Sequence, residues 1–296
     1  MTYPQIQTSR VLVNSLPKSG THLLSNTMEL LGYVDYFSSE GYDPQNPRFF
    51  TAREVKRALG AEGQAANEAN PGEKFCIGPV AAYPVAVETL QQWLAAVPYQ
   101  RYVLGHIPWS AGLGELLASQ DYYHIFIIRD PRAVFVSRLR YILDPGAARD
   151  LYDDRKHFLE DALTAMTPAD RIEFLLQGGQ AEGAGVPIRS YADAYRSALA
   201  WNQDDRCLLI RFEDLVGSRG GGSDEAQRQT IEQIAAHMGL EDNADLTAKL
   251  DKIYDPTART FKSGKIDGWK KILDPESLER LTAYCQPLCE EAGYTL

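Results

Sequence analysis

Residues 10–32 combine a predicted strand, a tight turn and a predicted helix, and this pattern constrains the fold more than any other. The stretch opens with a short, β-branched apolar run, which predicts a buried strand. Leu24, Met28 and Leu31 follow at helical spacing, and Gly32 stands where a helix would end. The polar turn between the two elements therefore lies at the carboxyl end of a strand and at the amino end of a helix.

This turn contains residue types that suit an anion site. The first amides of a helix have no partners inside the helix, and the helix dipole places partial positive charge there. Gly20 lets the backbone close around an anion, and Lys18 adds a full charge. Ser19 and Thr21 add hydroxyl donors. The turn predicts a phosphate site, although an ordinary turn with a solvated lysine would have the same residues. It is not a Walker A loop, because the lysine precedes the single glycine of the turn.

A second strand-to-helix junction follows at residues 124–141. Residues 124–128 are almost entirely apolar, which is typical of a buried strand. Pro131 suits the first turn of the helix predicted after it. Arg129 therefore stands at the carboxyl end of a strand, beside another helix N-terminus. Open parallel sheets bind their ligands at that edge.

The rest of the chain alternates between strand-like and helix-like segments, and it has no internal repeats. Further strands are predicted at residues 101–104 and 207–210, and further helices at residues 85–97, 191–203 and 231–238. This alternation predicts an α/β fold: a single doubly wound domain over residues 1–296, with a mainly parallel central sheet flanked by helices. Residues 143–190 have a helical pattern broken by proline and glycine, which predicts an excursion off the sheet.

Three segments are predicted to be loops. Residues 33–50 are rich in aromatic and turn residues, so they could pack on the core or form the wall of an apolar pocket. Residues 60–73 are polar and aperiodic, which predicts a surface loop. Residues 261–271 contain four lysines, two glycines and one tryptophan, and fit either a solvated basic turn or a loop that folds over an anion.

Composition excludes some classes of function. A net charge of −10 argues against sequence-independent nucleic-acid binding, and it means that a local cluster of Lys and Arg must hold any anionic ligand. The spacing of the four cysteines fits no zinc pattern, although Cys285 and Cys289 could form a metal or redox pair on a helix. No stretch approaches ~20 apolar residues, so we expect a cytoplasmic protein without a membrane anchor.

The three basic stretches together imply a ligand with separated phosphates, and they resemble the cytosolic-type sulfotransferases that use 3′-phosphoadenosine 5′-phosphosulfate (PAPS). Residues 15–22 are similar to the 5′-phosphosulfate loop of that family, and residues 129–138 to its 3′-phosphate motif. Residues 262–270 resemble its Arg-Lys-Gly-x-x-Gly-Asp-Trp-Lys loop. The resemblance implies a P-loop-like sulfotransferase fold and PAPS as cofactor. It also implies 3′,5′-diphosphoadenosine (PAP) as product, and no metal.

The resemblance also implies which residues hold the cofactor. These residues are Lys18, Ser19, Gly20, Thr21 and His22 at the 5′ end, Arg129 and Ser137 at the 3′-phosphate, and Phe212, Lys262, Ser263 and Gly264 around them. The chain departs from the family pattern at several positions, two of them near the adenine. Leu23 stands where the family often has a tryptophan, Phe212 where it often has a tyrosine, and Ser263 replaces a lysine.

His106 is the candidate general base. Residues 105–108, Gly-His-Ile-Pro, follow a predicted strand and resemble the family's Thr-His-Leu-Pro. The resemblance implies that His106 takes the proton of an acceptor hydroxyl, although a lone histidine after a strand is more often structural. Lys18 would neutralise the charge that develops on the leaving phosphate.

The implied reaction moves the sulfuryl group of PAPS to a hydroxyl group, or less readily an amine, of a small molecule. The aromatic loops hint at a partly apolar acceptor, with residues 143–190 near it. A metal-dependent nucleotide kinase is the alternative, with Lys18 on the phosphates and Asp130 on Mg²⁺. A nucleotide-binding regulator without chemistry is a third hypothesis. The sequence indicates neither the acceptor's identity nor the oligomeric state.

Overall fold

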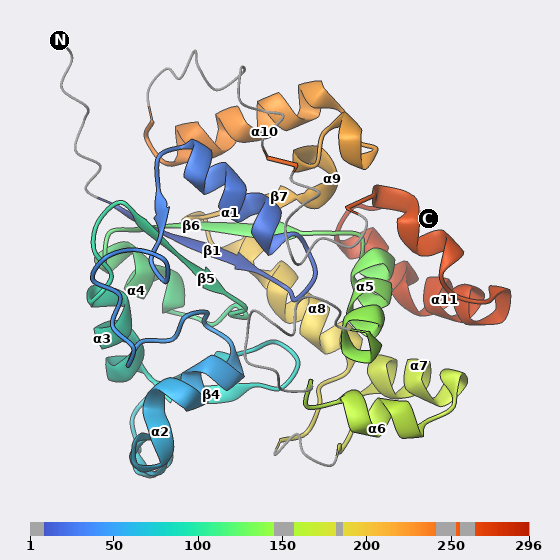
Figure 1. The fold of residues 1–296 in the computed structure, drawn as a ribbon, viewed down its shortest axis with the longest axis horizontal. Coiled ribbons are helices and arrows are strands. Elements are labelled where there is room, and N and C mark those ends of the chain that lie inside the picture. Colours follow the sequence, from blue (N-terminus) through green and yellow to red (C-terminus); the bar gives the residue numbers. More distant parts are fainter. Residues whose placement is uncertain (1–8, 145–156, 182–185, 241–252, 255–263, 296) are drawn as a thin grey trace.

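A five-stranded parallel sheet forms the centre of the computed structural model (Figure 1). The structure describes the whole chain except residues 1–8, 145–156, 182–185, 241–252, 255–263 and 296. In spatial order the strands are β2 (Val34–Asp35), β5 (Arg101–Gly105), β1 (Arg10–Ser15), β6 (Tyr122–Ile128) and β7 (Cys207–Arg211). A separate antiparallel pair joins β3 (Lys74–Ile77) and β4 (Tyr83–Ala86). The predicted doubly wound α/β fold is confirmed.

Helices cover both faces of the sheet (Figure 1). One face carries α1 (Thr21–Leu30), α9 (Phe212–Leu215) and α10 (Asp224–His237), and the other carries α3 (Val87–Ala95), α4 (Leu113–Ser119) and α8 (Tyr191–Leu199). Next to the second group stand α5 (Pro131–Leu143), α6 (Glu160–Ala165), α7 (Pro168–Gln177) and α11 (Pro275–Glu291). Helix α2 (Ala52–Ala69) packs near β4, and short 3-10 segments span Ala200–Gln203, Ser218–Gly220 and Ile266–Lys271.

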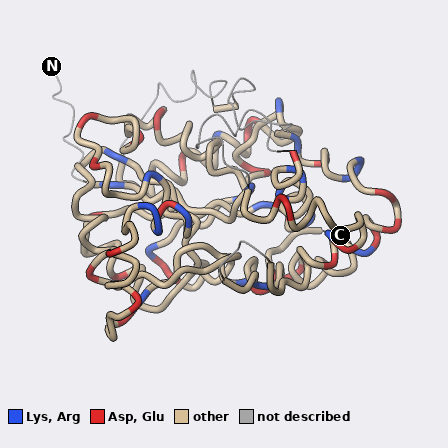
Figure 2. The backbone as a smooth tube through the Cα atoms, turned by 60° about the horizontal axis from the view of Figure 1, so that its bottom comes forward, with Lys and Arg blue, Asp and Glu red and all other residues tan. Residues whose placement is uncertain are grey.

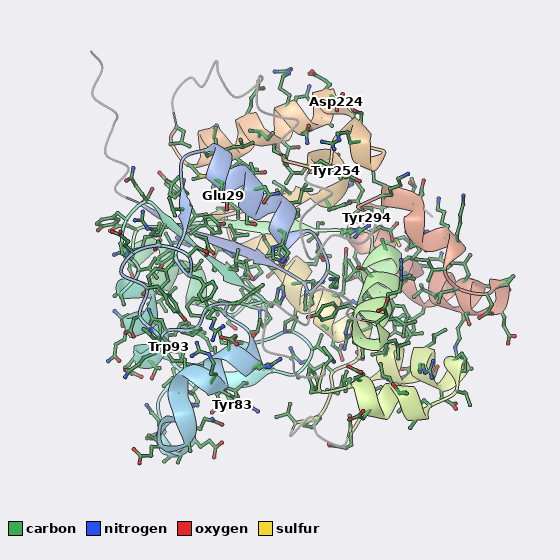
Figure 3. All side chains as sticks on the ribbon, in the orientation of Figure 1. Glu29, Tyr83, Trp93, Asp224, Tyr254 and Tyr294 are labelled. Carbon is green, nitrogen blue, oxygen red and sulfur yellow. The ribbon has the colours of Figure 1, made fainter. Side chains whose placement is uncertain are left out.

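The two covered faces follow from the alternation of side chains along each strand. Val11 and Val13 belong to the core cluster under α1 and α10, while Leu12 between them belongs to the cluster on the other face. Ile125 and Phe126 of β6 divide in the same way. Strands buried on both faces are continuously apolar, which is why these two were the easiest to predict. Side chains fill the space between the layers (Figure 3).

The carboxyl ends of four strands meet at one edge of the sheet. Ser15 pairs with Ile127, and Asn14 with Gly105, so β1 ends level with its two neighbours. Ile128 pairs with Arg211, which brings the end of β7 to the same place. The turns that follow β1, β5, β6 and β7 are therefore neighbours in space.

The predicted loop at residues 60–73 is wrong, because helix α2 extends through most of it to Ala69. Thr51 begins that helix by accepting a hydrogen bond from the Glu54 amide. Alanine, glutamate and glutamine are good helix formers, and they outweigh the glycines that suggested a loop. Gly60, with φ 63° and ψ −178°, is not helical, so α2 consists of two helical segments joined at a kink.

The helix predicted over residues 85–97 begins only at Val87, because Tyr83–Ala86 pairs with β3 as strand β4.

The excursion over residues 143–190 contains α6 and α7, with residues 145–156 and 182–185 outside the described part. Residues 33–50 were expected either to pack on the core or to form the wall of a pocket, and different side chains do each. Phe50 is buried in the core, whereas Phe49 lines a pocket.

Basic and acidic residues are both spread along the described chain (Figure 2). No helix in this part is long and apolar enough to cross a membrane.

Candidate active site

A cavity of about 550 Å³ opens at the edge where the four strands end. It brings together most of the residues predicted from sequence: Lys18, Gly20, Thr21, His22, His106, Arg129, Ser137, Phe212 and Gly264. Ser19 lies beneath its wall and is fully buried. Lys262 and Ser263 lie outside the described residues.

The turn after β1 has the backbone of an anion site. Gly20 precedes α1 with φ 112°, and a Cβ at this position would lie 2.7 Å from the Phe212 ring. No side chain caps the helix, so its first amides have no partner from a capping residue. Lys18 has φ 75°, in the left-handed region that a lysine seldom adopts. Strain of this kind is common at ligand-binding turns.

Two buried polar atoms near this turn have no hydrogen-bond partner among the described residues: Ser19 Oγ and Arg129 Nε. A buried donor without a partner costs about 1–3 kcal/mol. Arg129 lines the cavity, so its Nε would gain a partner from an anion bound there, whereas Ser19 does not line it. The closed glycine turn and the Arg129 guanidinium fit a ligand with phosphate groups.

Two contacts hold the Arg129 side chain. Its guanidinium carbon lies 4.1 Å from the centroid of the Phe212 ring, and its Nη2 donates to the Lys265 carbonyl at 3.0 Å. Burial lowers its pKa, while the nearby carboxylates of Glu213 and Asp130 act in the opposite direction. The side chain is only 9% exposed, so its position is fixed before any ligand arrives.

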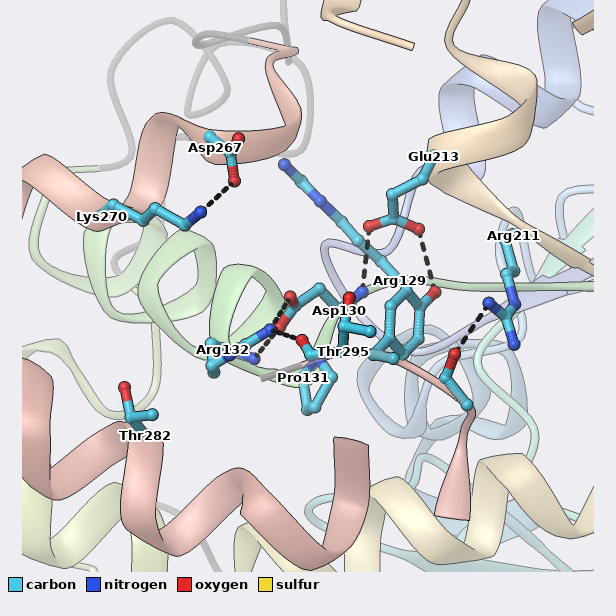
Figure 4. A network of polar contacts seen from close by, with 12 residues as sticks. Arg129, Asp130, Pro131, Arg132, Arg211, Glu213, Asp267, Lys270, Thr282 and Thr295 are labelled. Atoms are coloured by element: carbon cyan, nitrogen blue, oxygen red, sulfur yellow. Dashed lines mark hydrogen bonds and ion pairs between the residues drawn. The ribbon is translucent and has the colours of Figure 1, made fainter. Parts of the chain in front are cut away.

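A polar network fixes the turn after β6 (Figure 4). Glu213 accepts hydrogen bonds from the Asp130 amide at 3.1 Å and from the Tyr294 hydroxyl at 2.9 Å. The Asp130 carboxylate caps α5 by accepting from the Arg132 amide at 2.8 Å, and it also pairs with the Arg132 guanidinium at 2.7 Å. Arg132 in turn donates to the Thr295 carbonyl. Both oxygens of Asp130 are therefore engaged in holding the backbone.

His106 is oriented by the end of strand β1. Its Nδ1 lies 2.9 Å from the Ser15 carbonyl oxygen and 3.2 Å from Ser15 Oγ. A carbonyl can only accept, so Nδ1 carries the proton and Nε2 keeps its lone pair. The Ser15 hydroxyl is fixed in turn by Thr21 Oγ1 at 2.6 Å. The Phe49 ring packs against the imidazole at 4.5 Å.

Burial lowers the pKa of His106 to about 4, and the nearby His22 and Lys18 act in the same direction. The pKa of His22 is likewise lowered to about 4, first by burial and then by the charge of Lys18. Both imidazoles are therefore neutral at pH 7. A neutral imidazole with a free Nε2 can accept a proton.

Lys18 reaches across the cavity toward α5. Its Nζ lies 4.3 Å from the centroid of the Tyr141 ring, a cation–π contact. Sequence reasoning missed Tyr141 and the orienting role of Ser15. Ser15 lies inside the similar motif and so carried a signal, whereas nothing in the sequence pairs Tyr141 with Lys18.

The cysteines take no part in this site. Cys285 and Cys289 are buried in α11, and burial raises the pKa of both thiols, that of Cys289 to about 11. In the described residues no group of three metal-binding side chains occurs. The suggested metal or redox pair gains no support.

The chain is similar to known proteins in sequence and in fold. Residues 8–293 match the model of the sulfotransferase domain family. A mouse sulfotransferase complexed with PAP superposes with a TM-score of 0.53 at 16% identity, over 97% of this chain and 86% of that one. Retinol dehydratase in complex with androsterone and inactive cofactor PAP superposes with a TM-score of 0.52 at 14% identity, over 96% of this chain and 81% of that one. Retinol dehydratase in complex with retinol and PAP superposes with a TM-score of 0.53 at 16% identity, over 96% of this chain and 82% of that one. At these identities the likeness shows a shared fold. No curated protein sequence matches the chain.

Proposed function

Since the chain belongs to the sulfotransferase domain family, we propose that it transfers the sulfuryl group of PAPS to a hydroxyl group of a small molecule. We also propose that residues 1–296 act as one sulfotransferase unit, with the 143–190 excursion beside the acceptor. The observation that carries the proposal is the shared cavity of Lys18, Arg129 and a neutral His106 with its Nε2 lone pair available.

The cavity residues suit the two ends of the nucleotide. Lys18 and the open amides at the start of α1 would hold the 5′ end. Arg129, through its unpartnered Nε, and the Ser137 hydroxyl would hold the 3′-phosphate. Phe212 and Leu23 also line the cavity and would contact the adenine.

PAPS supplies the sulfuryl group and leaves as PAP. His106 Nε2 accepts the proton of the acceptor hydroxyl as that oxygen attacks. The Ser15 carbonyl holds the Nδ1–H, which keeps the tautomer correct and stabilises the imidazolium that forms. Lys18 meets the negative charge that develops on the leaving phosphate, in a place fixed beforehand by its backbone and by Tyr141.

The kinase alternative asks Asp130 to bind Mg²⁺. Its carboxylate already caps α5 and pairs with Arg132, so metal binding would unmake both interactions. A nucleotide-binding regulator without chemistry would not require a histidine held with its Nε2 lone pair available. We therefore favour the sulfotransferase.

Affinity for the 3′-phosphate tests the cofactor assignment. PAP should bind at least roughly 10²-fold more tightly than AMP, because Arg129 and Ser137 add charge-assisted hydrogen bonds. Isothermal titration calorimetry measures both affinities. Arg129→Met should remove most of the difference. Equal binding of PAP and AMP to the unaltered protein would refute the assignment of both residues.

A further inference from the structure

One end of the cavity has a composition that the nucleotide does not explain. Arg53, Arg138, Tyr141, His157 and Phe158 line it, and we call these five residues the arginine end. They come from the start of α2, the last two turns of α5 and the residues just before α6. The groups assigned to the nucleotide lie in the turns after β1 and β6, at Ser137 of α5 and at the start of α9, and Tyr141 lies one helical turn beyond Ser137. None of the five residues of the arginine end is assigned to a phosphate, so this end is available to the acceptor.

Arg138 is the central residue of the arginine end. Its side chain is 6% exposed, and its buried Nη1 has no hydrogen-bond partner in the described part of the chain. Burial lowers its pKa to about 10, so it stays charged at pH 7. Within the described residues no carboxylate forms an ion pair with it. A buried charge without a counter-ion is costly, which suggests that a ligand supplies one.

His157 adds a neutral donor. The Leu159 amide donates to its Nδ1 at 3.2 Å, so the ring proton lies on Nε2. Burial lowers the pKa of His157 to about 3, and the charges of Arg138 and Arg53 act in the same direction. The imidazole stacks on the Phe158 ring, with the ring centroids 4.5 Å apart, and packs in a T-shaped arrangement with Tyr141, with the centroids 6.0 Å apart. These two aromatic contacts hold the imidazole, with its Nε2 proton, in place.

The acidic residues nearby do not neutralise these groups. Glu54 lines the same cavity, but its Oε2 lies 2.8 Å from Arg57 Nε and 3.8 Å from Arg48 Nε. Glu160, which follows soon after His157, does not line the cavity. In the described part of the chain Glu160 pairs with neither arginine of the arginine end. Among the described residues, the arginine end therefore carries net positive charge, in a protein whose net charge is −10.

We propose that the acceptor carries a carboxylate, or a similar oxyanion, besides the hydroxyl group that is sulfated. Arg138 and Arg53 bind the anion with His157, and Tyr141 and Phe158 pack against an apolar body between the two groups. The inference rests on the proposed function, because it concerns the acceptor of that reaction. The anion stays unchanged. A bond forms between the hydroxyl oxygen and sulfur, the bond from sulfur to the leaving phosphate breaks, and the proton moves to His106.

A pair of matched phenols tests this inference. With PAPS as donor, 3-(4-hydroxyphenyl)propionate should have a kcat/KM roughly 10–10²-fold above that of 4-propylphenol, the range for one or two charge-assisted hydrogen bonds. The difference should lie mainly in KM. In Arg138→Met and in Arg53→Met the ratio should fall toward one. Arg53 lies at the surface, so its variant keeps the test valid if the buried replacement does not fold.

Arg196→Met is the matched control, because Arg196 pairs with Glu291 at the surface and does not line the cavity. It should keep the ratio of the unaltered protein. A ratio near one in the unaltered protein would refute the inference while leaving the sulfotransferase in place. Equal losses for both phenols in Arg138→Met and Arg53→Met would also refute it, since the arginines would then be structural.

A binding measurement separates this inference from the reaction. 3-Phenylpropionate has no hydroxyl group and cannot be sulfated, yet it should bind the PAP-loaded protein in calorimetry. Arg138→Met or Arg53→Met should weaken that binding at least roughly 10-fold. If neither phenol is sulfated but 3-phenylpropionate binds in this way, the proposed reaction fails and the anion site stands. No difference between the variants and the unaltered protein would refute the site itself.

Discussion

Replacing His106 with alanine should lower kcat by roughly 10²–10⁴-fold, the usual range for loss of a general base. An acceptor hydroxyl has a pKa far above 7, so it attacks poorly unless a neighbour takes its proton. PAP affinity should change little, because the phosphates meet Lys18 and Arg129. Steady-state kinetics and calorimetry on the same preparation measure both quantities.

His106→Asn is the informative second variant, since its side-chain amide can still donate to the Ser15 carbonyl. It should keep the local structure and yet lose turnover to a similar extent. Thermal unfolding of both variants checks that the fold is retained. Turnover at the level of the unaltered protein in either variant would make His106 structural, and the base would have to be another residue of the cavity.

Replacing Lys18 with methionine should damage both turnover and binding. Its charge meets the 5′ end in the ground state and the leaving phosphate in the transition state. We expect kcat to fall by roughly 10²–10³-fold, as for loss of one preorganised electrostatic group. PAP affinity should fall by roughly tenfold. Methionine keeps the length of the side chain, so the comparison isolates the charge.

Lys56→Met is the matched control for Lys18→Met. Its Nζ lies 4.9 Å from the centroid of the Tyr83 ring, a cation–π contact like that of Lys18 with Tyr141, but it does not line the cavity. It should leave kcat and PAP affinity near their original values. A Lys18→Met variant with unchanged kcat would contradict the role of Lys18 at the leaving phosphate.

The sequence predicted the parts of the site that depend on local order. A strand that is apolar on both faces, followed by a turn and a helix, specifies its own geometry, and parallel strands end at a common edge. That is why Lys18, Arg129 and His106 could be expected in one cavity. The sequence also predicted that the backbone closes at Gly20. The structure agrees, because Gly20 has φ 112°, a conformation that other residues rarely adopt.

Other parts depend on contacts between distant segments. Arg53, Arg138 and His157 stand on three separate segments of the chain, and only the packing of α2, α5 and the residues before α6 brings them to one cavity. Helix α2 itself was missed, because its glycines suggested a loop. The contribution of Lys262 and Ser263 to the cofactor site stays a prediction, since these residues lie outside the described part.

Transfer of radioactive sulfur from labelled PAPS to an acceptor phenol, measured with purified protein in EDTA, tests the central claim most directly. Lys18 and the amides at the start of α1 supply the positive charge at the 5′ end, so turnover should persist in the chelator. It should be lost in Lys18→Met and in His106→Ala. We predict labelled sulfate ester and PAP in equal amounts, and no phosphorylated product from ATP and Mg²⁺. Phosphoryl transfer from ATP, with no label on any phenol, would contradict the account.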